Sequence, residues 1–361
     1  MSAANSVKNF RPSKNGFHFS NSYPSGTAYP AVTLPLLGTI VSGDAGNGLC
    51  GGFAFAARDI FQIHQVPPPG SSLPPAGGPL FNYLSSRLLQ SFGSSPIYDN
   101  AAKVIQWIQT PSHDVTISFY GSGLGDRMVK DEWPKIKADI DAGNPSPLNL
   151  VMGPECGAGD IPGIIAALHH CHQVLAYAYS LDNQNNLTLT VYDCNNPDND
   201  NVTIEMNIGD PSHTISINAP LVMSALGEAS NNMRGVFRSD YEFRDPTSIV
   251  PTEMSIVSPA ANSTVSGTIN LVAQAQCVEG VGFSAYYATS PANIQTVGWH
   301  LLGQATAQAN GTWTLSYDTR SIPDQGNAGW GTVNICAFAT DFNGNAGTMA
   351  NRVYQRVNIH N

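Results

Sequence analysis

Apolar side chains recur every three or four positions through much of the first 142 residues, which is the spacing of one buried face of a helix. The run that begins at Leu49 is the clearest, and the turn sequence Gly-Asn-Gly stands directly before it. A charged run further along ends at Gly143, a residue suited to a helix C-terminus. The pattern predicts helices over residues 49–64, 80–92, 100–109 and 126–142.

After residue 146 the pattern changes to the alternation of apolar and polar residues that is typical of strands. It predicts strands over residues 147–152, 173–179, 187–192, 202–208 and 213–217. Helices followed by an antiparallel sheet is an α+β order. After about residue 251 the spacing favours an all-β sandwich, with strands over residues 268–275, 282–287, 299–302, 311–317 and 333–339.

The chain has 361 residues, which fits two domains better than one. The segment 245–253 contains two Pro-Thr pairs and has the composition of a linker. We therefore expect an α+β domain over residues 1–248 and a β-sandwich over residues 252–361. The N-terminal arm, residues 1–45, is expected to be irregular with some extended segments.

Charge and hydropathy exclude several kinds of partner. Only 12% of the residues are charged and the net charge is −10, so no basic surface for a phosphate backbone is expected. The apolar runs are shorter than the roughly 18–20 residues that cross a bilayer, so no membrane span is predicted. The first thirty residues lack the apolar stretch of a secretory signal.

The strongest local signal for chemistry is Cys50, which the pattern places in the first turn of a helix. Unpaired N–H groups and the positive end of the helix dipole stabilise a thiolate there. The glycines on either side leave the sulfur uncrowded, and the Cys50 N–H can donate to an oxyanion. The alternative is a small buried cysteine at the start of a core helix.

A thiolate nucleophile needs a base and a group that orients the base. His172 opens one predicted strand, and Asp193 follows the end of the next. Two adjacent antiparallel strands can bring these side chains together. The imidazole would then pair with the Cys50 thiolate while the carboxylate fixes its tautomer. Phe53 and Tyr179 are expected to wall this site.

These segments, in this chain order, resemble the papain-like superfamily of cysteine peptidases, in the branch related to bacterial peptidases that trim double-glycine leader peptides. The resemblance rests on GLCGG at residues 48–52, on HQVLAYAY from residue 172 and on YDCNNP at residues 192–197, and covers roughly residues 30–245. It implies that Cys50 is the nucleophile, His172 the general base and Asp193 the orienting acid, with Asn195 as a substitute for Asp193. It implies a peptide or protein substrate and no cofactor.

One position departs from that family. Its oxyanion donor is a Gln six residues before the nucleophile, where this chain has Asp44. An ionised carboxylate would repel an oxyanion, whereas the amide of Asn47 could donate to it. Two hypotheses follow: a thiol hydrolase that cleaves a peptide or amide bond, and a catalytically silent papain-like fold that serves binding or adhesion.

The C-terminal part resembles the immunoglobulin-like modules of bacterial extracellular proteins, through GTWTLSYDT at residues 311–319 and CAFATDFNGN at residues 336–345. The resemblance implies a spacer or adhesive unit, contact with a surface or a glycan, and a surface or extracellular setting. Strand parity argues against a disulfide between Cys277 and Cys336, because the apolar residues around Cys336 alternate away from it. We expect no metal site in the crowded run at residues 169–172, because neighbouring side chains point in different directions.

Overall fold

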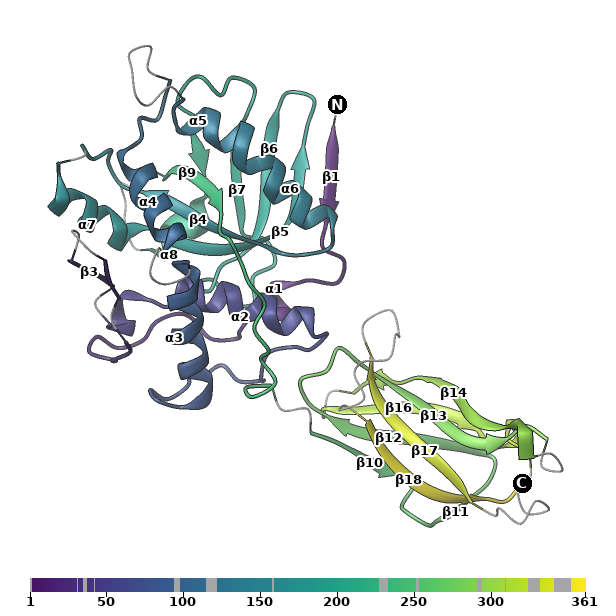
Figure 1. The fold of residues 1–361 in the computed structure, drawn as a ribbon. Coiled ribbons are helices and arrows are strands. Elements are labelled where there is room, and N and C mark those ends of the chain that lie inside the picture. The colour runs from purple at the N-terminus through teal and green to yellow at the C-terminus, as the bar shows by residue number, and fades with distance from the viewer. Residues whose placement is uncertain are drawn as a thin grey trace. The chain divides into compact units, whose positions relative to one another are not determined.

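The computed structural model describes residues 2–30, 32–34, 38–41, 43–93, 98–114, 122–157, 159–226, 233–250, 253–290, 294–308, 310–323, 332–340 and 352–361. These residues form two compact units (Figure 1). The first comprises residues 1–62 and 69–249, and the second comprises residues 63–68 and 250–361. The chain passes from the first unit to the second at residues 249–250, in the segment that the sequence indicates as a linker. Residues 63–68, which were predicted to belong to the first domain, belong instead to the second unit.

The first unit is built on a seven-stranded sheet in which every pairing is antiparallel. The strand order is β8-β7-β6-β5-β4-β9, and β1 adds to β5 beside this path. The strands are β1 (Ala3–Ser6), β4 (Ser146–Met152), β5 (His172–Leu181), β6 (Asn186–Tyr192), β7 (Thr203–Asn207), β8 (Ile217–Asn218) and β9 (Met233–Arg238). A separate hairpin joins β2 (Val32–Leu34) to β3 (Gly38–Val41).

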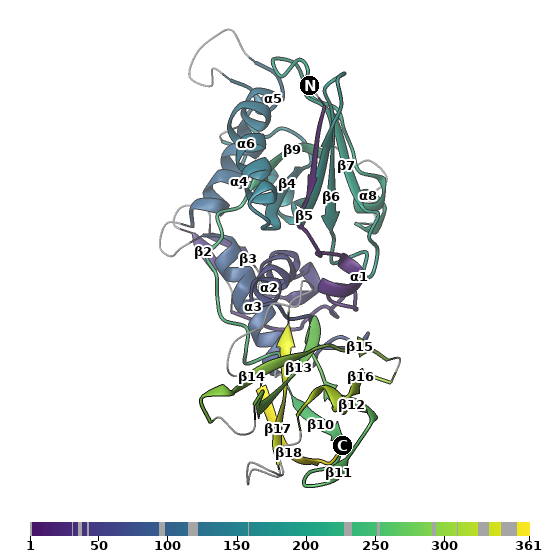
Figure 2. The ribbon, with the colours of Figure 1, turned by 90° about the vertical axis from the view of Figure 1, so that its right-hand side faces the viewer.

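Helices cover this sheet on both faces. In Figure 2, α4, α5 and α6 lie along one face while α8 lies beside β7 on the other. The helices are α1 (Pro12–Asn15), α2 (Cys50–Gln62), α3 (Pro79–Ser91), α4 (Asp99–Gln109), α5 (Leu124–Asp126), α6 (Trp133–Asp141), α7 (Ile161–His170) and α8 (Pro220–Ala225). A π-helical turn at Arg127–Glu132 joins α5 to α6. The predicted combination of helices with an antiparallel sheet is confirmed.

Several sequence predictions differ from the structure. The N-terminal arm contains extended segments, as predicted, and one of them, β1, pairs with β5. The strand predicted over residues 213–217 forms only at its end, in β8, because Pro211 and the polar turn after it precede a short pairing. The sequence reading missed α7, whose start Ile-Pro-Gly has the composition of a loop. It also missed β9, which pairs with β4 in the sheet.

The second unit consists of two sheets that share one apolar core. The strand orders are β10-β12-β16-β15 and β11-β18-β17-β13-β14. The strands are β10 (Met254–Ser258), β11 (Thr264–Val265), β12 (Thr268–Ala275), β13 (Gly280–Ala288), β14 (Val297–Gln304), β15 (Thr306–Ala307), β16 (Thr312–Asp318), β17 (Val333–Thr340) and β18 (Arg352–Ile359). The core includes Leu271 from the first sheet and Phe283, Ile335 and Val357 from the second.

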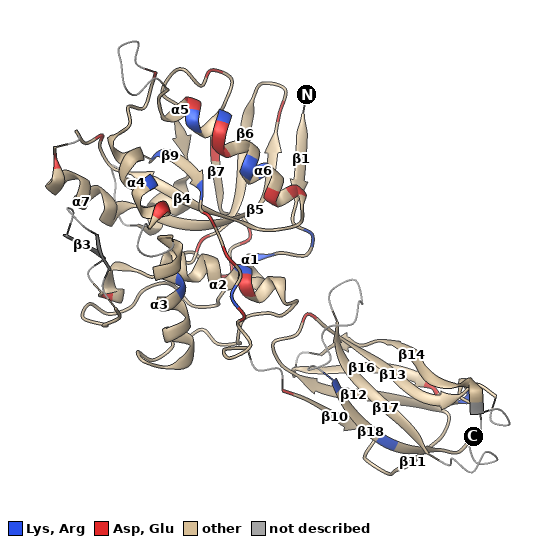
Figure 3. Ribbon diagram, viewed as in Figure 1, with Lys and Arg blue, Asp and Glu red and all other residues tan. Residues whose placement is uncertain are grey.

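Cys277 and Cys336 are not bonded to each other, and all six cysteines are free thiols. The predicted strands of this unit all form, with bounds that shift by a few residues. Residues 341–345 of the segment CAFATDFNGN, which contributes to the resemblance of this part to immunoglobulin-like modules, lie outside the described residues. Charged residues are sparse on these strands compared with α5 and α6 of the first unit (Figure 3).

Two glycines at the start of α2 allow α3 and β5 to approach it closely. A Cβ at Gly52 would lie 2.1 Å from the carbonyl oxygen of Leu84 in α3. A Cβ at Gly51 would lie 2.2 Å from Ser91 Oγ and 2.3 Å from Gln173 Oε1. The glycines are needed for this packing, because any larger residue would push the beginning of α2 away from its neighbours.

We predict that Gly52→Ala destabilises the first unit by about 1–3 kcal/mol, the usual cost of overpacking against groups that cannot move aside. Urea unfolding monitored by circular dichroism measures the change. Gly157→Ala is the matched control, because a Cβ at Gly157 meets no atom within 4 Å. Equal stability of the two variants would contradict the close packing of α2 on α3.

Candidate active site

Cys50 is the first residue of α2 and is half-buried. A short 3-10 turn, Ala45–Asn47, precedes it, and Gly48 follows with a φ of 91°. The side chain of Asn21 holds this turn, because its Oδ1 accepts the Leu49 N–H at 2.8 Å. The sulfur is thus fixed at the N-terminal end of the helix, where the dipole favours a negative charge.

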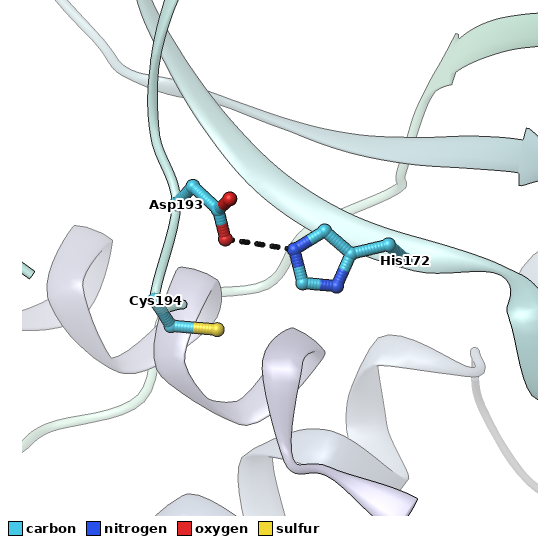
Figure 4. Close-up of side chains that lie close together, drawn as sticks. All are labelled: His172, Asp193 and Cys194. Carbon is cyan, nitrogen blue, oxygen red and sulfur yellow. Dashed lines mark hydrogen bonds and ion pairs between the residues drawn. The ribbon is translucent and has the colours of Figure 1, made fainter. Parts of the chain in front are cut away.

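His172 and Asp193 lie at the ends of two paired strands, β5 and β6. His172 Nε2 and Asp193 Oδ1 are 2.8 Å apart, and the residues are only 3% and 0% exposed (Figure 4). The sulfur of Cys50 is hydrogen-bonded to the His172 ring. Since His172 Nε2 is hydrogen-bonded to Asp193, the other ring nitrogen, Nδ1, is the one that faces the Cys50 sulfur. The structure therefore brings the three predicted residues together in one hydrogen-bonded chain.

Both oxygens of Asp193 are held by the loop that follows it. The Asn195 N–H donates to Oδ1 at 3.0 Å, and Asn196 Nδ2 donates to Oδ2 at 2.9 Å. Asn195 thus orients the carboxylate through its backbone and does not replace it as the partner of His172. The carboxylate is positioned before any substrate arrives.

Asp193, His172 and Cys50 each stabilise the charged form of the neighbouring group. Burial raises the pKa of the Cys50 thiol, but the hydrogen bond and charge of His172 outweigh burial and bring the pKa below its ordinary value. The backbone N–H groups of Gln173 and Gly51 add to this effect. Burial lowers the pKa of His172, but the Asp193 carboxylate overcomes it and raises that pKa to about 10. A thiolate–imidazolium pair is the favoured state near neutral pH.

The thiol pKa values of the other five cysteines are shifted in the opposite direction. Burial is the largest influence on each, and the pKa of each thiol lies above its ordinary value. They are Cys156, Cys171, Cys194, Cys277 and Cys336. Cys50 is thus the single cysteine of the chain whose pKa is lowered, and the other five serve as internal references for its reactivity.

The Asp44 carboxylate is held by the turns on either side of it in space. Its carboxylate accepts the N–H groups of Gly26 and Gly46 at 2.9 and 2.8 Å, and the Ser25 hydroxyl at 3.2 Å. The N–H donors, led by that of Gly26, lower its pKa. Asp44 therefore caps the turn before α2. Asn47 is exposed and lines the cavities on both sides of Cys50.

Two cavities meet at Cys50 and His172. The first, of about 100 Å³, is mainly apolar, and its walls include Tyr29, Leu88, Phe92, Val104 and Leu168. The second, of about 290 Å³, is mainly polar, and its walls include Asn21, Asn47, His169, His170 and Asn195. An extended chain could cross the sulfur with an apolar group on one side and a polar group on the other.

Phe53 and Tyr179 were expected at this site, but both pack elsewhere. Phe53 stacks edge-on against Phe17 and Phe19, and the ring of Tyr179 packs on Trp133. The sequence reading missed the contributions of Asn21 and Gln173. Residue type gives no signal for either, since Asn21 acts through the Leu49 N–H and Gln173, inside the HQVLAYAY segment, acts through its own backbone.

Metal-binding groups also gather here. Within the part of the chain that the structure describes, one group of His, Cys, Asp and Glu side chains is close enough to hold an ion, namely His172, Asp193 and Cys194. His169 and His170 are exposed at the end of α7 and do not belong to it. In the described residues, each helix is too short or too polar to cross a membrane.

No family model and no curated protein matches the sequence. Among solved structures, an endo-β-1,4-mannanase from Thermotoga petrophila is 14% identical over 31% of this chain and 20% of its own, with a TM-score of 0.22. A modular endo-β-1,4-mannanase from Cellulomonas fimi is 15% identical over 42% and 29%, with a TM-score of 0.18. An engineered protein is 17% identical over 42% and 30%, with a TM-score of 0.20. This chain thus spans less than a third of each structure, and scores this low carry no argument about fold or function.

We predict that Cys50 reacts with iodoacetamide at pH 6 faster than the other five cysteines, and that Asp193→Asn slows this reaction by about tenfold or more. Without the carboxylate charge, the pKa of His172 falls and the thiolate loses its partner. The pH profile of alkylation then moves to higher pH. Peptide mapping by mass spectrometry measures each cysteine separately.

Asp131→Asn is the control for that measurement, because Asp131 is an exposed carboxylate on the turn before α6. Its removal should leave the pH profile of Cys50 unchanged. If Cys50 reacted at pH 6 no faster than a model thiol, the ion pair would not exist.

Proposed function

We propose that the first unit is a papain-like thiol hydrolase, a cysteine peptidase that cleaves a peptide or amide bond, and that the second is an immunoglobulin-like module. One observation carries the proposal. His172 contacts Asp193 through Nε2 at 2.8 Å and faces Cys50 at the start of α2 with its other nitrogen. A buried core cysteine would need neither the imidazole nor the carboxylate behind it.

The geometry supports a two-step acyl transfer. The Cys50 thiolate attacks the carbonyl carbon of the scissile bond, and the bond between carbon and sulfur forms as the oxygen takes the negative charge. His172 then gives its Nδ1 proton to the leaving amine. In the second step His172 removes a proton from water, which attacks the thioester and frees the sulfur. Asp193 keeps Nε2 protonated throughout.

The oxyanion requires donors close to the sulfur. The Cys50 N–H belongs to the first turn of α2, whose N–H groups have no partner inside the helix. We assign the second donor to the side-chain amide of Asn47, which lines both cavities. The Asp44 carboxylate accepts from Gly26, Gly46 and Ser25, so Asn47 is the side chain that we assign to this role.

We predict that Cys50→Ala lowers kcat/KM for peptide cleavage by about a thousandfold or more, because the reaction loses its nucleophile. A broad peptide library, read by mass spectrometry, identifies the cleaved bonds. Cys277→Ala is the matched control, since Cys277 is a buried thiol of the second unit. Equal cleavage by Cys50→Ala and wild type, or no cleavage by wild type, would contradict a peptidase.

A specific observation favours a contact function for the second unit. Trp299 on β14 lies between Tyr286 of β13 and Tyr354 of β18, with ring centroids 5.3 and 5.6 Å apart. Trp299 and Tyr354 are 49% and 56% exposed, and Leu301 beside them is 68% exposed. Aromatic rings with polar tips suit a partner that offers both apolar faces and hydrogen-bonding groups. Sugar rings have that chemistry, so we propose a glycan ligand.

We predict that electrophoresis in gels containing soluble polysaccharides retards the wild-type protein, and that Trp299→Ala weakens the retardation by about tenfold, the loss expected for one ring contact. Val257→Ala is the control, because Val257 is 56% exposed on the other sheet. Equal migration of wild type and Trp299→Ala in every polysaccharide would show that this aromatic face binds no glycan.

A further inference from the structure

The sheet face that carries the exposed aromatic rings of the second unit also carries polar groups. The strand register across β14, β13, β17 and β18 places four residues in one row, namely Trp299, Tyr286, Asn334 and Arg356. Side chains at paired positions of a sheet point to the same face. An indole, a phenol, an amide and a guanidinium therefore lie side by side on this face.

A second guanidinium lies on the same strand, β18. Arg352, Tyr354 and Arg356 occupy alternate positions, so their side chains share one face. The residues between them face the opposite way, since Val353 packs against the core and Val357 belongs to it. Four residues of a strand span about 13 Å, so one cation stands on each side of the Tyr354 ring along the strand.

The two cations of β18 have no negative partner. Neither Arg352 nor Arg356 forms an ion pair within the described residues, and Nε of Arg352 is buried without a hydrogen bond. Arg320 is the one other basic residue in the sequence of this unit, and Asp318 pairs with it at 2.8 Å. The unpaired positive charge of the second unit is thus gathered on the face that bears the aromatic rings.

A small cavity of about 110 Å³ lies beside this row, and its walls include Tyr286, Tyr287, Asn334 and Arg356. The amide of Asn334 is half-buried and its side chain forms no hydrogen bond within the described part of the chain. Because one water needs only about 10–15 Å³ of such volume, the cavity holds a group of a few heavy atoms. Its walls offer N–H donors from an amide and a guanidinium, and both lack an acceptor.

We propose that this face binds an acidic polysaccharide, with a sugar ring on Trp299 and the carboxylate of a uronic acid in the cavity beside Asn334 and Arg356. The inference deepens the glycan ligand proposed for the second unit and rests on it. A guanidinium donates two parallel N–H bonds that match the two oxygens of a carboxylate. In a uronic acid the carboxylate is attached directly to the sugar ring, so one sugar supplies both the apolar face and the anion.

The charge balance favours a carbohydrate over a nucleic acid, which is also an anion with flat rings. The sequence of the second unit contains five acidic and three basic residues. A protein bound firmly to a phosphate backbone makes roughly 6–10 phosphate contacts, whereas this face offers two cations. A ligand with a few carboxylates and many neutral hydroxyl groups suits such a surface better.

The test is affinity electrophoresis of the full chain in gels that contain polygalacturonate or alginate, both polymers of uronic acids. The methyl ester of polygalacturonate is the matched ligand, because esterification removes the charge and keeps the sugar. We expect the acid to bind at least about tenfold more tightly than its ester, since hydrogen bonds to a charged group are the stronger ones. Salt at about 0.5 M should weaken binding of the acid alone.

Arg356→Gln should raise the Kd for the acidic polymer by about tenfold and leave the Kd for the ester unchanged, because it removes only the partner of the carboxylate. Arg320→Gln is the matched control. It removes the same charge from a residue that is already paired with Asp318, and it should change neither Kd.

Several results would overturn the acidic ligand. Equal binding of the acid and its ester by wild type would do so whether or not any variant folds, and would leave a neutral glycan as the ligand. An equal Kd in wild type and Arg356→Gln would also reject the carboxylate site. Single-stranded DNA that bound as tightly as the acidic polymers would show an unselective anion surface. If no polysaccharide bound, acidic, esterified or neutral, the glycan ligand itself would be rejected together with this inference.

Discussion

The close contact of the first turn of α2 with α3 and β5 is the constraint on which the site depends. Gly51 and Gly52 leave no room for a Cβ between this turn and Ser91, Leu84 and Gln173. The same turn carries Cys50, so the packing of the helix fixes the sulfur beside the β5 strand. The backbone N–H of Gln173 then reaches the sulfur from the strand. The same few residues thus pack the start of α2 against its neighbours and stabilise the negative charge on the Cys50 sulfur.

The sheet supplies the second half of the geometry through its register. His172 begins β5 and Asp193 follows β6, so the antiparallel pairing of the two strands brings both side chains to one end of the sheet. Burial of either group alone would favour its neutral form. Together they remain charged, because the Asp193 carboxylate stabilises the imidazolium of His172 and the imidazolium stabilises the carboxylate. Cys50 is the third group of this hydrogen-bonded series.

The sequence was sufficient to predict helices near α2, α3 and α4 and most strands, because long runs with one period dominate those segments. It failed at α7, where Pro and Gly at the start hide a helix whose apolar residues pack on β4 and α4. It singled out Cys50, His172 and Asp193, which the fold brings together, because thiols, imidazoles and carboxylates are residue types with chemistry. It could not find Asn21 or Gln173, since their parts in the site depend on which backbone groups come near in space.

Asp44 shows why a position in a family pattern is weaker evidence than a hydrogen bond. Counting back from Cys50 places a carboxylate where a donor is expected, which suggested repulsion of an oxyanion. Three donors surround that carboxylate, so its charge stabilises the loop that leads into α2. The hydrogen bonds that a carboxylate accepts are set by its neighbours in space, and a count of residues along the chain does not give them.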